Sequence, residues 1–515
     1  MNRLFNKRLL SSCAAACLQL STGTAASYAA TSLPAGAPVH HVLLVSIDGL
    51  HAIDLARFVA GHPDSTLAHL AHQGINYSNA HTVSPADSFP GLLALVTGGT
   101  PAVTGVYYDE TYDRALSAAG SDCGKTGTKV VYNEGVDLVG KSGKDVSIDP
   151  AKLPLDPQRG CTPVLPHSYL RVNTVFEVIR QAGGYTAWAD KHPTYEIVNG
   201  PSGKGVDDLF VPEIGANFEG SHGGKGAEIT GSLESTEAYD AFKARAVMNQ
   251  IDGRTHDGHG SAPVPNIFGL NMQALNVAQK LSGYSNAEGV ATPGVDAALA
   301  HCDELLGGFV AELSKAGLDD DTLIIVTAKH GNGPIDRTLL KKIDTAALKQ
   351  TIEAAAPGSA AQLAVDHGAL VWLRAPSKTA IVAAALEAHA AELGITDVLS
   401  GTRLALQFPS PLTDNRSPDI VILSDEGVIY AKPNAGKLVE HGGFHEDDTH
   451  VGLLVSNPRL KAMNRQVVFP VSTTQVAPTI LGALGLSPAS LQAVAQEGTP
   501  ALPGVSWQNS SVAAQ

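Results

Sequence analysis

Apolar segments of strand length recur along the chain and alternate with segments whose apolar residues have helical spacing. Helical patterns lie near residues 52–59 and over NTVFEVIRQAGG at 173–184. Alternation of this kind predicts an α/β fold with a mainly parallel central sheet and helices on both faces. The candidate strands are HVLLVSI at 41–47, YTAWAD at 185–190, NIFGLNMQ at 266–273, TLIIVTA at 322–328, DIVILS at 419–424 and HVGLLVS at 450–456.

Polar or charged residues follow three of these candidate strands directly. Asp48 and Lys191 each follow one strand, and Lys329-His330 follow TLIIVTA. Ligands of open α/β sheets gather at the carboxyl ends of the strands. We therefore expect these side chains to lie at one edge of the sheet and to form a site there.

Length and charge narrow the classes of protein further. The chain has 515 residues and 44 % hydrophobic composition, enough for one large domain with insertions. A formal net charge of −15 argues against a nucleic-acid-binding surface, so an anionic substrate needs a local cationic pocket.

Residues 107–170 and 199–262 are predicted to be lids or binding loops. Residues 340–416 are predicted to be a small subdomain, with a strand in GALVWLRA and a helix in SKTAIVAAALEAHAAEL.

The N-terminus has the pattern of an export signal. Basic MNRLFNKR precedes LLSSCAAACLQL, which is too short to span a bilayer, and Ser27-Tyr28-Ala29 resembles a cleavage site. A signal peptide over residues 1–30 predicts an exported protein, periplasmic or secreted, with no membrane span; a disordered soluble tail is the alternative.

The remaining cysteines divide into two kinds. Cys302 lies in a helical apolar pattern and is expected to be buried. Cys123 and Cys161 lie in polar loop sequence and are expected to pair in an oxidising compartment, with two free thiols as the alternative.

Two further segments carry side chains suited to chemistry. In SPADSFPGLLALVTGG, Ser88 precedes a helical run, so its hydroxyl could be an N-cap or a nucleophile assisted by the helix dipole. In VEHGGFHEDDTHVGLLVSNP, His441 and its polar neighbours could bind metal, bind phosphate or form a solvated loop.

Four segments together resemble the alkaline phosphatase superfamily, in particular the type I phosphodiesterase/nucleotide pyrophosphatase branch. They occur in family order and imply an alkaline-phosphatase-like hydrolase domain over residues 38–510. The segments are LLVSIDGL, DSFPGLLALVTGGTPAVTGVYYDETYD, IIVTAKHG and HGGFHEDDTHVGLLVSNP.

The resemblance implies a role for each matching residue. Members of the family usually hold two zinc ions and form a phosphoryl-enzyme, which implies Ser88 as nucleophile. The metal ligands implied are Asp48, Ser88, His330 and His441. Lys191 of ADKHP resembles a phosphate-contacting lysine, and we assign it a catalytic role and substrate binding. Asp109 and His192 are further candidates for substrate binding, and near Asp109 the family usually has an Asn that contacts phosphate.

The sequence also departs from the family pattern. Lys329 stands where the family has a metal-binding Asp, and our alignment places Leu275 and Gln279 where it has an Asp and a His. A protonated lysine has no lone pair for zinc but supplies fixed positive charge. We expect Lys329 to lie near Asp48, as a structural ion pair or as a catalytic group that activates Ser88. At most one tightly bound divalent metal, zinc by family precedent, is expected.

These features favour an exported hydrolase of phosphate esters, either diesters and nucleotide-like substrates or monoesters. Two alternatives remain open, because this fold hosts several chemistries. One is a sulfate or phosphonate ester hydrolase. The other is a degenerate, non-catalytic member that binds an anion or a glycan, which would be consistent with the replaced metal ligands.

Overall fold

A central sheet of eight strands forms the core of the protein. The computed structural model describes residues 33–34, 36–139, 146–215 and 229–508, so the predicted signal peptide lies outside the described residues. Every neighbouring pair in the sheet is parallel except those that β21 makes with β13 and β2. The predicted α/β fold with a mainly parallel sheet is confirmed. In spatial order the strands are β11 (Asp208–Phe210), β10 (Ala187–Ala189), β12 (Ile267–Met272), β1 (His41–Ile47), β13 (Thr322–Thr327), β21 (Leu454–Ser456), β2 (Gly74–Tyr77) and β22 (Arg465–Val467).

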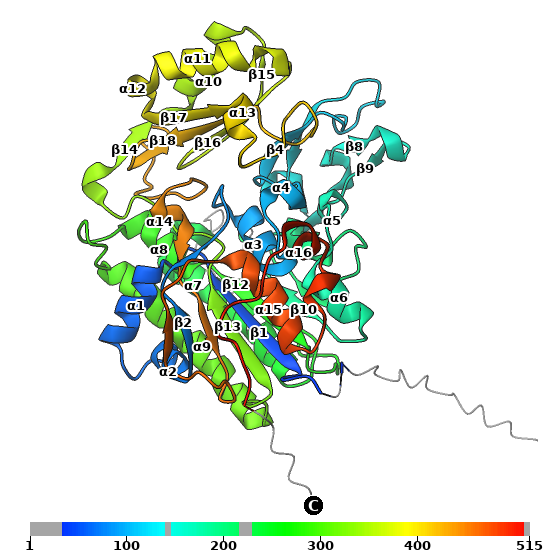
Figure 1. The fold of residues 1–515 in the computed structure, drawn as a ribbon, viewed down its shortest axis with the longest axis vertical. Coiled ribbons are helices and arrows are strands. Elements are labelled where there is room, and N and C mark those ends of the chain that lie inside the picture. Colours follow the sequence, from blue (N-terminus) through cyan, green and yellow to red (C-terminus); the bar gives the residue numbers. More distant parts are fainter. Residues whose placement is uncertain (1–32, 35, 140–145, 216–228, 509–515) are drawn as a thin grey trace, which may run out of the picture.

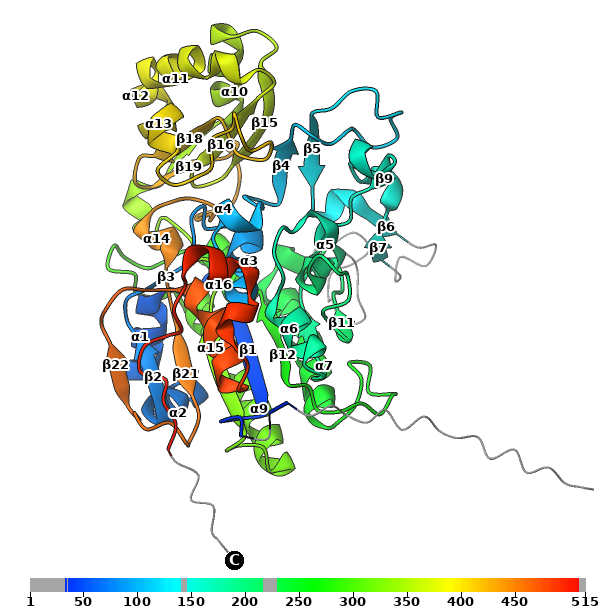
Figure 2. The ribbon, with the colours of Figure 1, turned by 45° about the vertical axis from the view of Figure 1, so that its right-hand side comes forward.

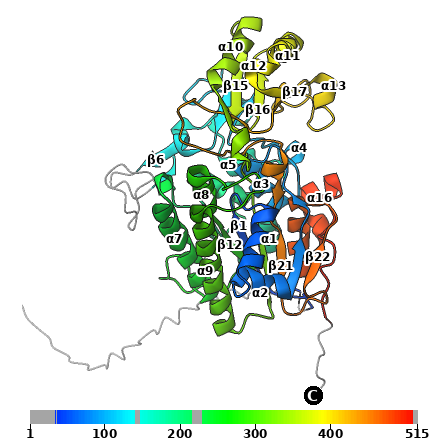
Figure 3. The ribbon, with the colours of Figure 1, turned by 90° about the vertical axis from the view of Figure 1, so that its left-hand side faces the viewer.

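Helices cover both faces of this sheet (Figures 1 and 3). Side chains of a strand alternate between its two faces. Val42 and Leu44 of β1 therefore join one hydrophobic cluster, and Leu43 and Val45 join the other. The first cluster includes residues of α3 (Ser88–Thr97), α6 (Val175–Gln181) and α15 (Val476–Ala483). The second includes residues of α1 (Ala52–Gly61), α2 (Thr66–Gln73), α7 (Leu233–Ile251), α8 (Ala274–Ser282) and α9 (Pro293–Ala316).

A second, antiparallel sheet lies beyond one end of the central sheet, at the top of Figures 1 and 2. It packs against α10 (Thr345–Ala355) and α11 (Thr379–Ala388) through its own hydrophobic cluster. The sheet includes β18, so our placement of DIVILS among the strands of the main sheet is wrong. Its spatial order is β15 (Ala360–Val365), β16 (Ala369–Leu373), β18 (Ile420–Ser424) and β17 (Ile395–Ser400).

The segment HVGLLVS also differs from its prediction as one strand. It forms β20 (His450–Val451), which pairs with β3 (Ala80–His81), and then β21 of the central sheet. Between them, Gly452 donates its amide hydrogen to the carbonyl of Leu50. The chain therefore changes sheets within seven residues.

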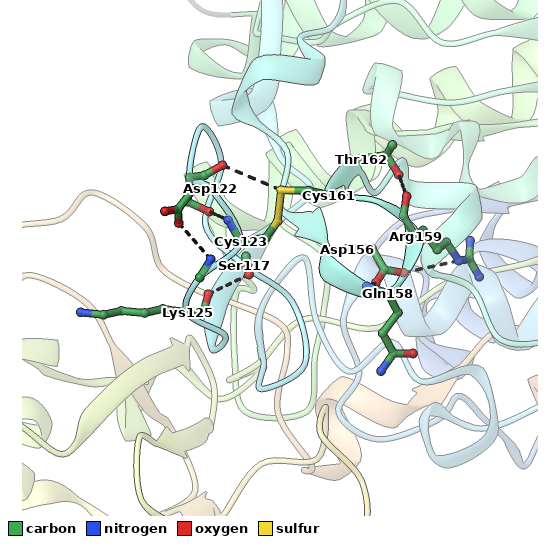
Figure 4. The surroundings of a disulfide bond; sticks show 11 residues. Ser117, Asp122, Cys123, Lys125, Asp156, Gln158, Arg159, Cys161 and Thr162 are labelled. Carbon is green, nitrogen blue, oxygen red and sulfur yellow. Dashed lines mark hydrogen bonds and ion pairs between the residues drawn. A yellow bond between two sulfur atoms is a disulfide. The ribbon is translucent and has the colours of Figure 1, made fainter.

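The predicted disulfide between Cys123 and Cys161 is confirmed, with the two Cα atoms 5.9 Å apart (Figure 4). It joins two loops of the segment that contains the hairpin of β4 (Glu110–Asp113) and β5 (Thr128–Val131). Cys302 lies in α9 and is fully buried, also as predicted. In the described part of the chain, no helix has the length and apolarity needed to cross a bilayer.

Candidate active site

Side chains from the ends of three parallel strands meet the first residue of α3. Asp48 comes directly after β1, Lys191 lies two residues past the end of β10, and His330 lies three residues past the end of β13. The Lys191 Nζ lies 3.1 Å from Asp48 Oδ2 and 3.0 Å from Ser88 Oγ. The carboxyl edge of the central sheet thus assembles a hydroxyl, an ammonium, an imidazole and a carboxylate.

Ser88 is not the N-cap of α3. That position belongs to Asp87, whose carboxylate accepts a hydrogen bond from the backbone amide of Phe89 at 3.2 Å. The hydroxyl of Ser88 is instead held by side chains of the site. The capping explanation for Ser88 is therefore wrong, and the hydroxyl is left free for another role.

His330 is oriented by its own loop. Its Nδ1 lies 2.9 Å from the carbonyl oxygen of Gly331, and its Nε2 lies 3.1 Å from Ser88 Oγ. A carbonyl only accepts hydrogen bonds, so Nδ1 carries a proton and Nε2 of the neutral ring has the lone pair. His330 can therefore accept the hydroxyl proton of Ser88.

Asp48 is surrounded by hydrogen-bond donors. Asn271 Nδ2 lies 2.8 Å from its Oδ1, and Gln273 Nε2 lies 2.6 Å from its Oδ2, which Lys191 also contacts. Burial alone would raise the pKa of Asp48, but Lys191, Lys329 and His330 together hold that pKa well below its usual value. Asp48 is therefore an anion whose two oxygens already accept hydrogen bonds.

Lys329 makes a different ion pair from the expected one with Asp48. Its Nζ lies 2.9 and 3.0 Å from the two carboxylate oxygens of Asp190 and 4.2 Å from the centre of the Tyr195 ring. Burial lowers the pKa of Lys329, against the attraction of Asp190 and Asp48. The expected ion pair between Lys329 and Asp48 is wrong, because the ammonium of Lys329 pairs with Asp190 instead. The lysine that contacts Asp48 and Ser88 is Lys191.

We expect Lys329→Met to lower the free energy of unfolding by about 3–5 kcal/mol, because it leaves the carboxylate of Asp190 buried without its partner. Both residues are fully buried. Chemical denaturation would measure the change. The double variant Lys329→Met/Asp190→Leu should recover most of the loss, and a double variant as unstable as the single one would contradict this explanation.

His441 lies against His330 on the side of Asp87. The two imidazole centres are 3.9 Å apart, and His441 Nδ1 is 3.8 Å from Asp87 Oδ1, with no hydrogen-bond partner among the described residues. Burial, reinforced by His330 and Lys280, lowers the pKa of His441 well below its usual value. This ring is therefore neutral at pH 7.

Besides Lys191, the two other residues predicted to bind substrate have contrasting surroundings. Burial raises the pKa of Asp109 well above its usual value, and the charges of Asp87 and Asp366 raise it further. His192 Nδ1 lies 2.8 Å from both carboxylate oxygens of Glu213. Burial and the charge of Lys191 lower the pKa of His192 to about 4. Asp109 is thus a candidate neutral donor, and only Nε2 of His192 remains for a substrate.

Sequence reasoning missed Asn271, Gln273 and Asp190. Each lies at or just beyond the carboxyl end of β12 or β10, so the expectation that ligands gather at strand ends, which selected Lys191, also indicates them.

The two positions aligned with family metal ligands are part of the buried framework. Leu275 lies in the hydrophobic cluster that α8 helps to form. Gln279 donates 2.8 Å to the carbonyl of Gly49, which makes it part of the buried framework.

The implied ligand set does not fit zinc between Asp48, Ser88 and His330. A ligand offers a lone pair, whereas the groups nearest to Asp48 are an ammonium and two amide N–H groups, which have none to offer. Lys191 bridges Asp48 and Ser88 directly. Its charge takes the position between the two side chains that a shared zinc ion would need.

A family model that matches most of the chain defines the class of this protein. The chain belongs to the type I phosphodiesterase/nucleotide pyrophosphatase family, whose model matches residues 42–448. The protein is therefore an enzyme of the phosphoric ester hydrolase class.

Solved structures of low sequence identity have the same fold. Alkaline phosphatase PafA is 15 % identical, with a TM-score of 0.63 over 92 % of this chain and 100 % of PafA. Murine ectonucleotide pyrophosphatase/phosphodiesterase 5 is 15 % identical, with a TM-score of 0.55 over 87 % of this chain and 96 % of that one. An inactive variant of the murine protein has been solved with AMP, at a TM-score of 0.54. No curated protein matches the chain in sequence.

Proposed function

We propose that the protein hydrolyses phosphodiesters or nucleotide-like phosphate esters through a phosphoseryl intermediate on Ser88. The observation that supports the proposal is the position of Ser88 Oγ, 3.1 Å from His330 Nε2 and 3.0 Å from Lys191 Nζ. A hydroxyl between a base and a fixed cation is the arrangement that activates a nucleophile.

In the proposed mechanism, Ser88 Oγ attacks phosphorus as its proton passes to His330 Nε2. The bond to the leaving oxygen breaks on the opposite side of phosphorus, and that oxygen takes a proton from solvent. Water then attacks the phosphoseryl group from that side and gives its proton to solvent, while His330 returns its proton to Ser88 Oγ, which leaves as the restored hydroxyl. Lys191 balances negative charge that develops on the nucleophile, and the N-terminus of α3 attracts the anionic substrate. Lys329 acts indirectly, by holding Asp190 beside Lys191.

A nucleotide-like substrate is proposed because the inactive variant of the murine protein, which has the same fold, is solved in complex with AMP. The family pattern has a phosphate-contacting Asn near the position of Asp109. A carboxyl whose pKa is raised well above its usual value stays protonated and can donate a hydrogen bond, as an amide does. We therefore propose that neutral Asp109 donates to a phosphoryl oxygen.

Asp109→Asn should retain turnover and remain active at higher pH than the wild type. The reason is the sign of the pKa shift: Asp109 donates while protonated and loses its proton as pH rises through its raised pKa, whereas Asn does not titrate. The measurement is kcat/KM against pH for both proteins. Asp109→Ala should be less active than Asp109→Asn at every pH, and identical alkaline limbs in wild type and Asp109→Asn would refute the role.

Export of the mature protein to the periplasm or the exterior is part of the proposal. Disulfides persist in oxidising compartments, and Cys123–Cys161 is one. N-terminal sequencing of protein from the extracellular or periplasmic fraction would test it, since the signal predicts cleavage near residue 30.

The test of activity is turnover of bis-p-nitrophenyl phosphate and p-nitrophenyl phosphate, with a chelator and with added zinc, manganese or calcium. Turnover that survives the chelator supports the proposal. Tight phosphate binding without turnover under any metal would contradict the proposal and would indicate a protein that only binds the anion. Hydrolysis of only the sulfate or phosphonate analogues would reassign the substrate.

A further inference from the structure

Two histidines and a glutamate converge on the surface, outside the candidate active site. His81 of β3 and His450 of β20 are directly opposite each other in an antiparallel pair, and their rings stack with centres 4.8 Å apart. Glu446 of α14 (Glu446–Thr449) lies one helical turn before His450. One possible ligand atom from each residue lies within 4.8 Å of the others.

Hydrogen bonds at Nε2 orient both imidazole rings so that Nδ1 of each faces Glu446. His450 Nε2 lies 2.9 Å from the carbonyl of Ser78, and His81 Nε2 lies 2.9 Å from Asn79 Oδ1. The Nδ1 atoms face the glutamate, at 2.9 Å for His450 and 3.9 Å for His81. Metal-binding histidines typically donate their other ring N–H to such an oxygen, which fixes the tautomer and orients the lone pair.

We propose that His81, Glu446 and His450 bind a divalent transition metal, Zn²⁺ by choice of ligands. Two imidazole nitrogens and one carboxylate oxygen form a common zinc set that leaves a position for water. Zinc bonds of about 2.0–2.1 Å place tetrahedral ligands about 3.3 Å apart. Ligand atoms within 4.8 Å of one another therefore reach a shared ion after small side-chain movements. Glu446 is the ligand most able to move, because 68 % of its side chain is exposed, against 29 % for His450 and 31 % for His81.

The bound ion would join β3 to α14 behind the candidate active site. Thr82, the residue after His81, donates its hydroxyl to the carbonyl of Lys329 at 2.7 Å and its amide to the carbonyl of Thr449. In α14, the carbonyl of Asp448 accepts the amide of Gly331. Both elements therefore support the loop that holds His330, and their junction is visible in Figure 2. Zinc here is structural and stabilises this loop.

Zinc titration of chelator-treated protein by calorimetry would test the site. Three variants are compared with the wild type: His81→Ala/His450→Ala, Glu446→Gln and the control His389→Ala. His389 is an exposed histidine that lies 3.2 Å from Glu392, so the control removes a single His–Glu pair outside the proposed site. The wild type and the control should bind one equivalent more than the double variant. Any zinc in the candidate active site is common to all four proteins and cancels in this difference.

Thermal unfolding gives a second measurement that does not depend on activity. Zinc should raise the melting temperature of the wild type and of His389→Ala but not of Glu446→Gln, which keeps both imidazoles and the shape of the carboxylate. Calcium should bind none of them at this site, because it prefers oxygen ligands. Equal zinc uptake by wild type and the double variant, or equal stabilisation of Glu446→Gln, would overturn the proposal.

Discussion

Ser88→Ala is expected to reduce phosphate-ester turnover by about 10³-fold or more while leaving the fold intact. The substitution removes the hydroxyl oxygen that lies 3.1 Å from His330 Nε2 and 3.0 Å from Lys191 Nζ. Asp87 caps α3, so stability should change little. Steady-state kinetics with bis-p-nitrophenyl phosphate, together with circular dichroism of the purified variant, would measure both effects.

Ser65→Ala is the matched control for this variant. Ser65 also lies at the start of a helix, where its side chain accepts from the amide of Ala68 at 3.1 Å. Its loss should cost about 1 kcal/mol of stability and no activity. Ser88→Ala should show the reverse, and wild-type-like turnover in that variant would eliminate the covalent mechanism.

The central strands could be predicted closely from sequence because they are buried on both faces. HVLLVSI coincides with β1, and TLIIVTA extends one residue past β13. DIVILS has the same apolar character for a different reason. Ile420 and Ile422 of β18 face one hydrophobic cluster and Val421 faces another, and neither cluster includes a residue of the central sheet. Hydrophobicity reports burial on two faces and does not say which sheet provides it.

The site could be predicted as a set of residues but not as a set of pairs. The rule of strand ends brought together Asp48, Lys191 and His330, which lie in contact. The partner of each lysine depends on how far its side chain reaches across neighbouring strands. Asp190 lies beside Lys191 in sequence, yet its carboxylate pairs with Lys329. The pairing is set by the three-dimensional arrangement of the side chains, because a buried charge without a partner is strongly destabilising.

The second large effect concerns zinc, and it rests on Lys191 more than on Lys329. Unit charges of like sign about 4 Å apart repel by about 4 kcal/mol at an effective dielectric near 20, and a divalent ion doubles that cost. An ammonium 3.1 Å from Asp48 and 3.0 Å from Ser88 should therefore exclude a tightly bound zinc ion from this position. We expect the purified protein to hold at most one equivalent of tightly bound divalent metal.

Lys191→Met/Lys329→Asp should gain zinc in this position. Lys191→Met removes the positive charge that excludes zinc. Lys329→Asp supplies the carboxylate that the family has at this position, and the bound zinc would offset the repulsion between this carboxylate and Asp190. Elemental analysis after dialysis, in a His81→Ala/His450→Ala background, isolates this position from the surface site. In the same background, Lys191→Arg keeps the positive charge and should take up no more zinc than the His81→Ala/His450→Ala protein. Two stoichiometric zinc ions in the wild type would contradict the argument, because they would require ligands other than those that surround Asp48.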